Sequence, residues 1–504
     1  MYNNIEMITA PKHRHQRGLK TFLMLCLTYL PGLVLLSCDD YDEFTTDRSS
    51  LLSFSADTVK FDTLLTTVSS STKTLLVYNR GDKGVRISKV ALEGGAASPF
   101  RINVDGQDLT RTEANVATDF EVRRRDSIVV RAEVTLEARN QDDPFAIADA
   151  LLFTLESGVQ QRIPLTVVGQ DAYFMKACTI TTDTLFTANR PIVVYDSLVV
   201  GQSATLTLAA GTQLMFHEGA GLLVHGRLLA QGSLQQPVIM RGDRTDHMFD
   251  YLPYDRLPGR WEGVRFSATS HDNDLTYLDL HSGLYGLVCD SSDLSVQKLN
   301  LLSCRVHNIG GDGLRLRHCK VSVMNSEISN TMGHCVSLLG GDATFVHCTL
   351  AQFYPLSAAR GYALYVGNRD EDIYIPLYNG TFINCVMTGY ADDVVQGTWV
   401  AGQDNEAHYS FVNCFLATEI PADNYGFTDC VYDDPDGELR HEKNFQLMDT
   451  HAFVYDFTPV EKSGIRGIAA TTYAATLPTD RLGRTRLTDG RADAGCYSFV
   501  ATEP

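Results

Sequence analysis

The sequence predicts an all-β protein in two parts, a β-sandwich followed by a right-handed parallel β-helix. Two observations carry this prediction. Within residues 51–170, short stretches with alternating apolar residues are separated by turns, a pattern that is typical of a sandwich. Within residues 178–500, very short apolar stretches recur at a fixed step of 22 residues, which indicates a solenoid whose coils stack on one another.

Residues 1–37 have the pattern of an export signal. A basic region extends from Lys12 to Lys20, and it is followed by the apolar run TFLMLCLTYLPGLVLL. The run is shorter than the roughly 20 residues that span a bilayer. Its end, LLSC at residues 35–38, resembles the lipobox of bacterial lipoproteins, which implies that Cys38 is lipidated and becomes the first residue of the mature chain. An ordinary signal peptide or an anchor helix with a chance cysteine is the alternative.

Residues 38–50 form an acidic tether. The run DDYDE at 39–43 resembles the tether that exports lipoproteins of Bacteroidetes-type bacteria to the cell surface, which implies an outer-membrane lipoprotein that faces outward. Residues 1–37 contain four of the 42 Lys and Arg residues and one of the 61 Asp and Glu residues. The mature chain therefore has 38 basic and 60 acidic residues, which gives a net charge of −22. Such a surface repels nucleic acid, and we expect membrane contact through the lipid alone.

The predicted sandwich contains six period-2 stretches. They are LLVYN (75–79), VRISKVAL (85–92), FRINVDG (100–106), SIVVRAEV (127–134), ALLFTL (150–155) and IPLTVVG (163–169). Their order resembles immunoglobulin-like modules that occur beside cell-surface and ciliary domains. The resemblance implies a spacer.

The predicted β-helix follows from one repeated step. Val306, Ile328 and Leu350 are 22 residues apart, and four other sets of positions keep this step. Strands of two or three residues cannot pair with their sequence neighbours, but they can pair with the equivalent strand one coil later. The region resembles the right-handed β-helix superfamily that includes pectate lyases. LPYDRLPGRWEGVRF (252–266) and LPTDRLGRTRLTDGRADAGCYSF (477–499) resemble surface lipoproteins with such repeats.

One motif recurs as TFVHCTL (344–350), TFINCVM (381–387), SFVNCFL (410–416) and GFTDCVY (426–432). Stacked inward positions must accept a copy of themselves, and a free cysteine is a compact apolar filler. A disulfide framework is the rival interpretation. No CxxC or HxxxH pair occurs, so we expect no metal site and no cofactor.

A candidate ligand-binding column contains Asp312, His334 and Asp393, each six residues past the inward apolar position of its coil. The coil after Leu350 carries an insertion, and matching its strand YALYV places Tyr362 at about the same position. Together with Trp399, these residues offer aromatic faces and hydrogen-bonding groups to a sugar. The alternative is that Asp and His occupy these positions only because turns favour such residues, with no role in binding a ligand. GDG and GHCV faintly resemble polygalacturonase motifs, but that family's Asn-Thr-Asp and Arg-x-Lys motifs are missing. The two carboxylates should be about 14 Å apart from the strand spacing.

The leading hypothesis is therefore a cell-surface lipoprotein whose β-helix binds a glycan without turnover. The expected partners are the outer membrane, through the lipid, and a polysaccharide, with no nucleic acid. The first alternative is an enzyme, either a polysaccharide lyase or a glycoside hydrolase. The second alternative is a structural or adhesion protein of the cell surface. The fold allows all three, since fold alone does not decide function.

Overall fold

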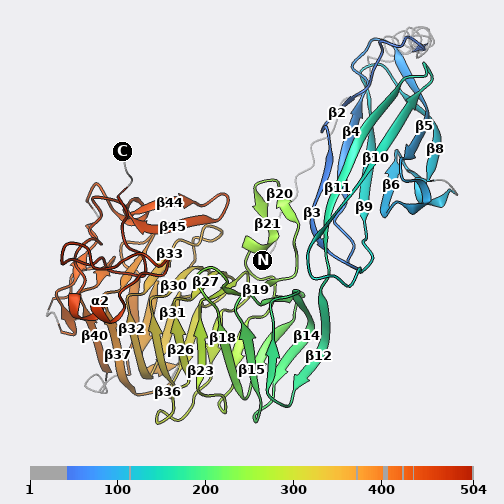
Figure 1. Cartoon of the computed structure of the whole chain (residues 1–504). Helices are drawn as coiled ribbons and strands as arrows, with labels where there is room; N and C mark the ends of the chain where they lie inside the picture. Colours follow the sequence, from blue (N-terminus) through green and yellow to red (C-terminus); the bar gives the residue numbers. More distant parts are fainter. Residues whose placement is uncertain are drawn as a thin grey trace, which may run out of the picture.

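The computed structural model describes residues 43–112, 115–370, 373–400, 407–422, 425–434 and 436–501. Cys38 and residues 1–37 lie outside this range. The described chain is nearly all β, and it forms a sandwich and a coiled stack of short strands (Figure 1). No helix in these ranges has the length and apolar character that crossing a membrane requires. The helices are η1 (Gly95–Ala97), η2 (Leu109–Arg111), η3 (Tyr254–Arg256), η5 (His441–Asn444) and α2 (Thr471–Thr476).

Two sheets face each other in the sandwich. Alternation explains the packing: in β9, residues Ile128, Val130, Ala132 and Val134 are buried and the residues between them are more exposed. One sheet holds β1 (Phe44–Thr45), β3 (Val59–Leu65), β5 (Gly84–Leu92), β8 (Val116–Val122), β10 (Phe145–Leu155) and β11 (Gln160–Gln170). The other holds β2 (Ser53–Phe54), β4 (Lys73–Tyr78), β6 (Phe100–Val104), β7 (Gln107–Asp108) and β9 (Ser127–Val134).

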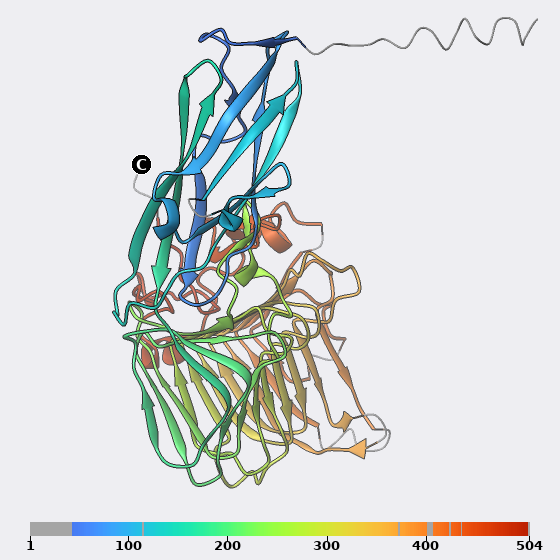
Figure 2. The same ribbon diagram turned by 90° about the vertical axis from the view of Figure 1, so that its right-hand side faces the viewer.

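The second part is a parallel β-helix. Each full coil contributes one strand to each of three series, and each strand pairs in parallel with its counterpart in the next coil. Series A and B form one bent 18-stranded sheet, and series C forms a 10-stranded sheet. The sandwich stands on the first coils, and the coils stack away from it (Figure 2).

The strands of each series are as follows. Series A holds β12 (Tyr173–Ile180), β14 (Ile192–Val200), β16 (Gln213–Phe216), β19 (Val238–Gly242), β24 (Leu278–His281), β27 (Arg305–Ile309), β30 (Glu327–Thr331), β33 (Thr349–Gln352), β38 (Val386–Gly389), β41 (Phe415–Leu416) and β43 (Val431–Tyr432). Series B holds the end of β14 with β17 (Gly221–Val224), β22 (Val264–Phe266), β25 (Leu287–Cys289), β28 (Leu314–Arg317), β31 (Val336–Leu339), β34 (Leu364–Gly367) and β39 (Val395–Thr398). Series C holds β13 (Thr184–Phe186), β15 (Thr205–Ala209), β18 (Arg227–Gln231), β23 (Asn273–Thr276), β26 (Leu299–Leu302), β29 (Lys320–Met324), β32 (Gly341–Val346), β37 (Leu377–Ile383), β40 (Ala407–Val412) and β42 (Phe427–Thr428).

The step of 22 residues corresponds to one coil. Val306 pairs with Ile328, and Ile328 pairs with Leu350. All three side chains are buried in the same core. Phe345, Phe382, Phe411 and Phe427 also stack, with ring centroids 5.0, 4.9 and 4.8 Å apart. The prediction of a parallel β-helix is therefore confirmed.

The repeated cysteine motif marks the corner between series C and series A. The residue before each cysteine has a left-handed backbone, as at Asn384 (φ 55°) and Asn413 (φ 49°), a conformation that Asn tolerates well. The following thiol then donates to a carbonyl of the preceding coil, from Cys385 to Phe345 at 3.6 Å and from Cys414 to Phe382 at 3.4 Å. Burial raises the pKa of the Cys385 thiol well above its usual value, so the proton needed for this bond is retained. The described cysteines are all free.

The short step from Cys414 to Cys430 also has a structural explanation. In this coil the chain passes from β41 of series A directly to β42 of series C. Among the described residues between these strands, 417–422 and 425–426, there is no series B strand, and the coil is correspondingly short. In the described chain β39 is the last strand of series B, whereas series A and series C continue to β43 and β42.

The coils end at β43, and residues 440–500 fold back over the outer side of series A (Figure 1). This segment, here called the tail, contains the antiparallel hairpin of β44 (Phe445–Asp449) and β45 (Val454–Pro459) as well as α2. The side chain of Asn384 donates to Ala470 O at 3.1 Å and accepts from Ala470 N at 2.7 Å. Phe353 of the solenoid packs against Phe457 of the tail, 6.0 Å between ring centroids.

A buried charge pair joins the tail to the coils. Glu327 of β30 is 1% exposed, and it accepts from Arg305 Nε at 3.0 Å, from Ser329 at 2.6 Å and from the Tyr497 hydroxyl. Burial by itself raises the pKa of Glu327, but Arg305 and other cations hold it below its ordinary value. The carboxylate is therefore ionised and bonded to both parts of the protein.

Candidate functional site

The outer side of series B is the first part of the solenoid where we look for a site, because the tail covers much of the outer side of series A. The column residues Asp312, His334, Tyr362 and Asp393 each stand two positions before a series B strand. The first inward residues of these strands, Leu314, Val336, Leu364 and Val395, pair in register. The four column residues consequently occupy equivalent places on four consecutive coils.

Asp312 and His334 are joined by a hydrogen bond. Asp312 Oδ1 accepts from the backbone N–H of His334 at 2.8 Å. This contact depends on Gly333, because a Cβ atom there would stand 2.3 Å from Asp312 Oδ1. The glycine therefore lets the carboxylate lie against the next coil.

His334 connects in turn to the following coil. Its Nδ1 accepts from the backbone N–H of Tyr362 at 3.0 Å, which leaves the neutral ring protonated on Nε2. The ring stacks on Tyr362 and on Tyr365, with centroids 5.6 and 4.7 Å away. Burial lowers the pKa of His334, and Asp312 only partly offsets this. At neutral pH the ring is an uncharged donor between two aromatic rings.

Asp393 completes the column but makes no contact with Asp312. Its carboxylate accepts from the Thr418 hydroxyl at 2.6 Å and from the Gln396 amide. It lies three coils from Asp312, about 14 Å at the usual strand spacing. The column therefore contains no close pair of carboxylates.

Trp399 is placed differently. Its ring stacks on Tyr409 at 5.8 Å and packs against the inner core of the solenoid. It follows β39 instead of preceding it. The structure brings Asp312, His334 and Tyr362 together, and it places Trp399 apart from them.

Two further residues extend the column, and the sequence reasoning missed both. Glu262 and Tyr285 stand two positions before β22 and β25, whose Val264 and Leu287 pair in register with each other and with Leu314. The missed signal is a repeated triplet of one variable residue, Gly and an aliphatic residue: EGV, YGL and DGL. We use the name series B row for six residues: Glu262, Tyr285, Asp312, His334, Tyr362 and Asp393. The row crosses five coil-to-coil steps, or about 24 Å at the usual strand spacing.

A cavity adjoins the first part of the row. It has a volume of about 430 Å³, and Glu262, Tyr285, Arg265 and Arg315 are among the residues that line it. Arg265 is bonded to both oxygens of Asp290 at 3.0 and 3.1 Å. At the opposite end of the series B strands, after β34, the hairpin of β35 (Arg369–Asp370) and β36 (Ile373–Tyr374) is held by Asp370, which pairs with Arg317 at 2.8 Å.

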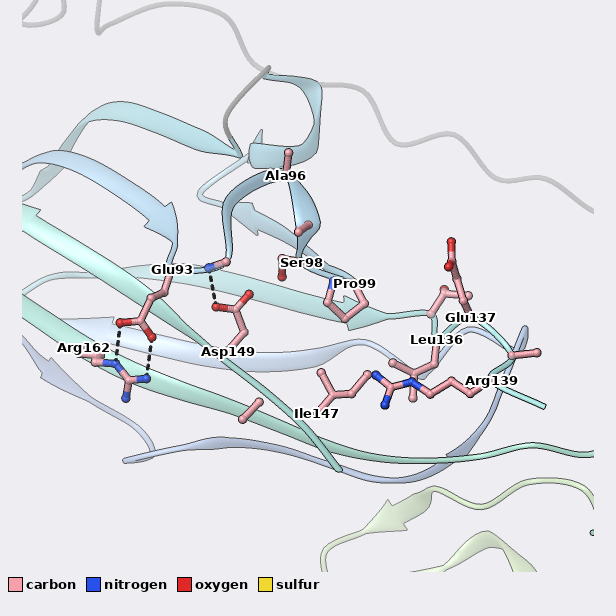
Figure 3. A pocket seen from close by; sticks show the side chains of 15 residues that line it. Glu93, Ala96, Ser98, Pro99, Leu136, Glu137, Arg139, Ile147, Asp149 and Arg162 are labelled. Atoms are coloured by element: carbon pink, nitrogen blue, oxygen red, sulfur yellow. Dashed lines mark hydrogen bonds and ion pairs between the residues drawn. The ribbon is translucent and has the colours of Figure 1, made fainter. Parts of the chain in front are cut away.

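The sandwich has a larger cavity of about 820 Å³. Its charged groups bond to their surroundings (Figure 3): Glu93 pairs with Arg162 at 2.7 Å, and Asp149 accepts from the Gly94 N–H at 2.9 Å. Arg139 lies over the Phe145 ring at 4.1 Å. No converging set of titratable side chains remains here, and we assign this cavity no chemistry.

Comparisons with known proteins add little. No protein-family model matches the chain, and no curated protein matches it. Among solved structures, the PapD-like domain 7 of human CEP192 is 15% identical, with a TM-score of 0.17 and coverage of 25% of this chain and 90% of that one. A family 123 glycoside hydrolase from Clostridium perfringens is 7% identical (TM-score 0.16), with coverage of 25% and 30%. A Porphyromonas gingivalis W83 protein of unknown function is 12% identical (TM-score 0.17), with coverage of 26% and 59%. Likeness at this level supports no inference about activity.

Proposed function

We propose that this chain is a lipid-anchored surface protein whose β-helix binds a glycan along the series B row without cleaving it. The observation that carries the proposal is the run Tyr285, Asp312, His334 and Tyr362 on consecutive coils. Tyr285 and Tyr362 are each 37% exposed. Exposed aromatic rings can stack on the apolar faces of sugar rings, and the Asp and His between them can bond to hydroxyl groups.

Binding without turnover is supported by the placement of the carboxylates. An inverting glycosidase needs its two carboxyl groups about 6.5–9.5 Å apart, whereas Asp312 and Asp393 are separated by three coils. Glu262 lies two coils from Asp312, about 10 Å at the usual strand spacing. Asp312 leans away from it, over Gly333 toward His334. His334 Nδ1 is also occupied by a backbone N–H and is not free to act as a base.

A glycan array with the full chain tests the binding. Loss of one stacked ring in Tyr362→Ala should weaken binding by about 1 kcal/mol, or about fivefold. Tyr473→Ala is the matched control, because Tyr473 is 41% exposed and lies on α2 in the tail. Equal binding by wild type and Tyr362→Ala would refute the row as the site.

The same protein should be incubated with neutral and uronic-acid polysaccharides. We expect no new reducing ends and no absorbance from unsaturated sugars. Either product would replace the binding function with a hydrolase or a lyase. A wild-type protein that binds no glycan but still attaches cells would favour the adhesion function.

The lipid anchor is a separate part of the proposal. It is supported by the LLSC sequence that ends at Cys38 and by the acidic run after it. We expect labelled palmitate to be incorporated into wild type and not into Cys38→Ala. Protease added to intact cells should digest the protein if it faces outward from the outer membrane.

A further inference from the structure

Three side chains on the outer side of series A converge on one point. Asp279 and His281 are two residues apart on β24, so their side chains lie on the same, outward face of the strand. His307 occupies the position that pairs with His281 on the next coil. Asp279 Oδ1 lies 2.8 Å from His281 Nδ1 and 3.0 Å from His307 Nε2. One ligand atom from each residue lies within 4.8 Å of the other two. Among the described residues, this is the one cluster of three or more His, Cys, Asp or Glu side chains that is close enough to hold a metal ion.

The group is held rigidly. His307 is 8% exposed, and its ring lies 4.9 Å from that of His281. The buried Trp261 donates from Nε1 to His281 O at 2.9 Å, which fixes the end of β24. Side chains on two adjacent strands of a sheet vary little in position, as a coordination site requires.

The surrounding charges tolerate a cation. Arg305, the nearest cation on the same strand as His307, is paired with Glu327 at 3.0 Å. On the preceding coil, Arg241 is paired with Asp255 at 2.8 Å. Arg241 and Arg305 are thus each paired with a carboxylate. Arg481 of the tail also acts electrostatically on Asp279, and it interacts with Glu327 as well. The hydrogen bonds of the Asp279 carboxylate are made with the two imidazoles. His307 Nδ1 is also buried without a hydrogen-bond partner in the described structure, so the group is not a fully satisfied hydrogen-bond network.

We propose that Asp279, His281 and His307 bind one first-row divalent metal ion, with Zn²⁺ as the best match. Two imidazole nitrogens and one carboxylate oxygen are a ligand set that Zn²⁺ accepts, whereas Ca²⁺ and Mg²⁺ prefer oxygen ligands alone. Three protein ligands leave one position for water. The side chain of Asp279 is 24% exposed, which gives the ion a path from solvent. The ion would link two successive coils, and it is independent of glycan binding at the series B row.

The test uses the full chain after treatment with a chelator and its removal. Zn²⁺ titration by calorimetry should show one site that His281→Gln and Asp279→Asn each weaken by at least about tenfold. His271→Gln is the matched control. His271 also faces a carboxylate, Asp272 at 2.8 Å, but the pair is exposed and lacks a third ligand. This variant should bind as wild type does.

A spectroscopic measurement on the wild type keeps the test independent of variant folding. Co²⁺ in place of Zn²⁺ should give the visible absorption of a four-coordinate ion, and zinc-edge absorption should detect two imidazole ligands. Equal Zn²⁺ affinity in wild type and His281→Gln would overturn the site. A wild-type spectrum of a fully hydrated ion would overturn it as well.

Discussion

The Glu327 carboxylate is predicted to hold the tail on the solenoid. Glu327→Gln keeps the shape of the side chain but removes its charge, so the partly buried Arg305 guanidinium loses its counterion. Breaking a buried pair from one side costs about 3–5 kcal/mol. Since Tyr497 of the tail bonds to the same carboxylate, we expect this cost to favour release of the tail.

The effect should be measured as local opening, because a chain with two parts does not unfold in one step. At about 3 kcal/mol, the open population rises by more than about a hundredfold. Hydrogen exchange of residues 440–500 and limited proteolysis would report this rise. Glu461→Gln is the control, because Glu461 lies in the tail and its side chain is exposed.

Two results would refute the reasoning. Tail exchange as slow in Glu327→Gln as in Glu461→Gln would mean that the ion pair does not hold the tail. The double variant Arg305→Met/Glu327→Leu removes both charges. The free energy by which it favours tail opening should be less than the sum of the free energies measured for Arg305→Met and Glu327→Leu alone. Strict additivity would show that the two side chains do not interact.

The remaining predictions concern pH, the core and the row. The folded pKa of Glu327 is below its ordinary value of 4.5, so its contribution to stability is complete above about pH 5 and is lost as pH falls through the folded pKa. The protection of the tail amides, that is, their exchange rate relative to the intrinsic rate at the same pH, should therefore fall in acid for wild type and not for Glu327→Gln. Phe382→Ala removes a fully buried ring stacked between Phe345 and Phe411, and should cost about 3–5 kcal/mol; an unchanged thermal unfolding of the solenoid would contradict it. A Cβ at Gly333 would stand 2.3 Å from Asp312 Oδ1 and 2.8 and 2.9 Å from backbone atoms of Gly311 and Asp312. Gly333→Ala should therefore displace the turn at Asp312 and weaken glycan binding with little change in circular dichroism, whereas equal binding would count against the row.

The solenoid could be predicted from the sequence because its physics is local and repetitive. An inward residue touches its own counterpart one coil later, so Val306, Ile328 and Leu350 had to be similar and evenly spaced. The same rule located Asp312 and His334 on adjacent coils. The rule does not find Glu262 and Tyr285. Insertions in residues 243–260 and before β26 make these coils longer than 22 residues, so their positions do not follow the repeat.

Contacts between distant segments left no such signal. Glu327 and Tyr497 are 170 residues apart in the chain, and no periodicity predicts that the tail would cover series A. Asp279 and His307 are 28 residues apart, which is not the spacing of a known metal motif. The sequence groups Trp399 with the column only because its aromatic face could stack on a sugar ring. Packing against Tyr409 and the core decided its position instead.

The thiol at each corner of the solenoid has a consequence for biogenesis. In the finished fold, Cys348, Cys385 and Cys414 are sealed from oxidants, each with its proton shared with a neighbouring carbonyl. Before folding, the same thiols are close in sequence and open to mispairing in an oxidising compartment. If the chain is exported as proposed, oxidation of these thiols should therefore be confined to chains that have not yet folded.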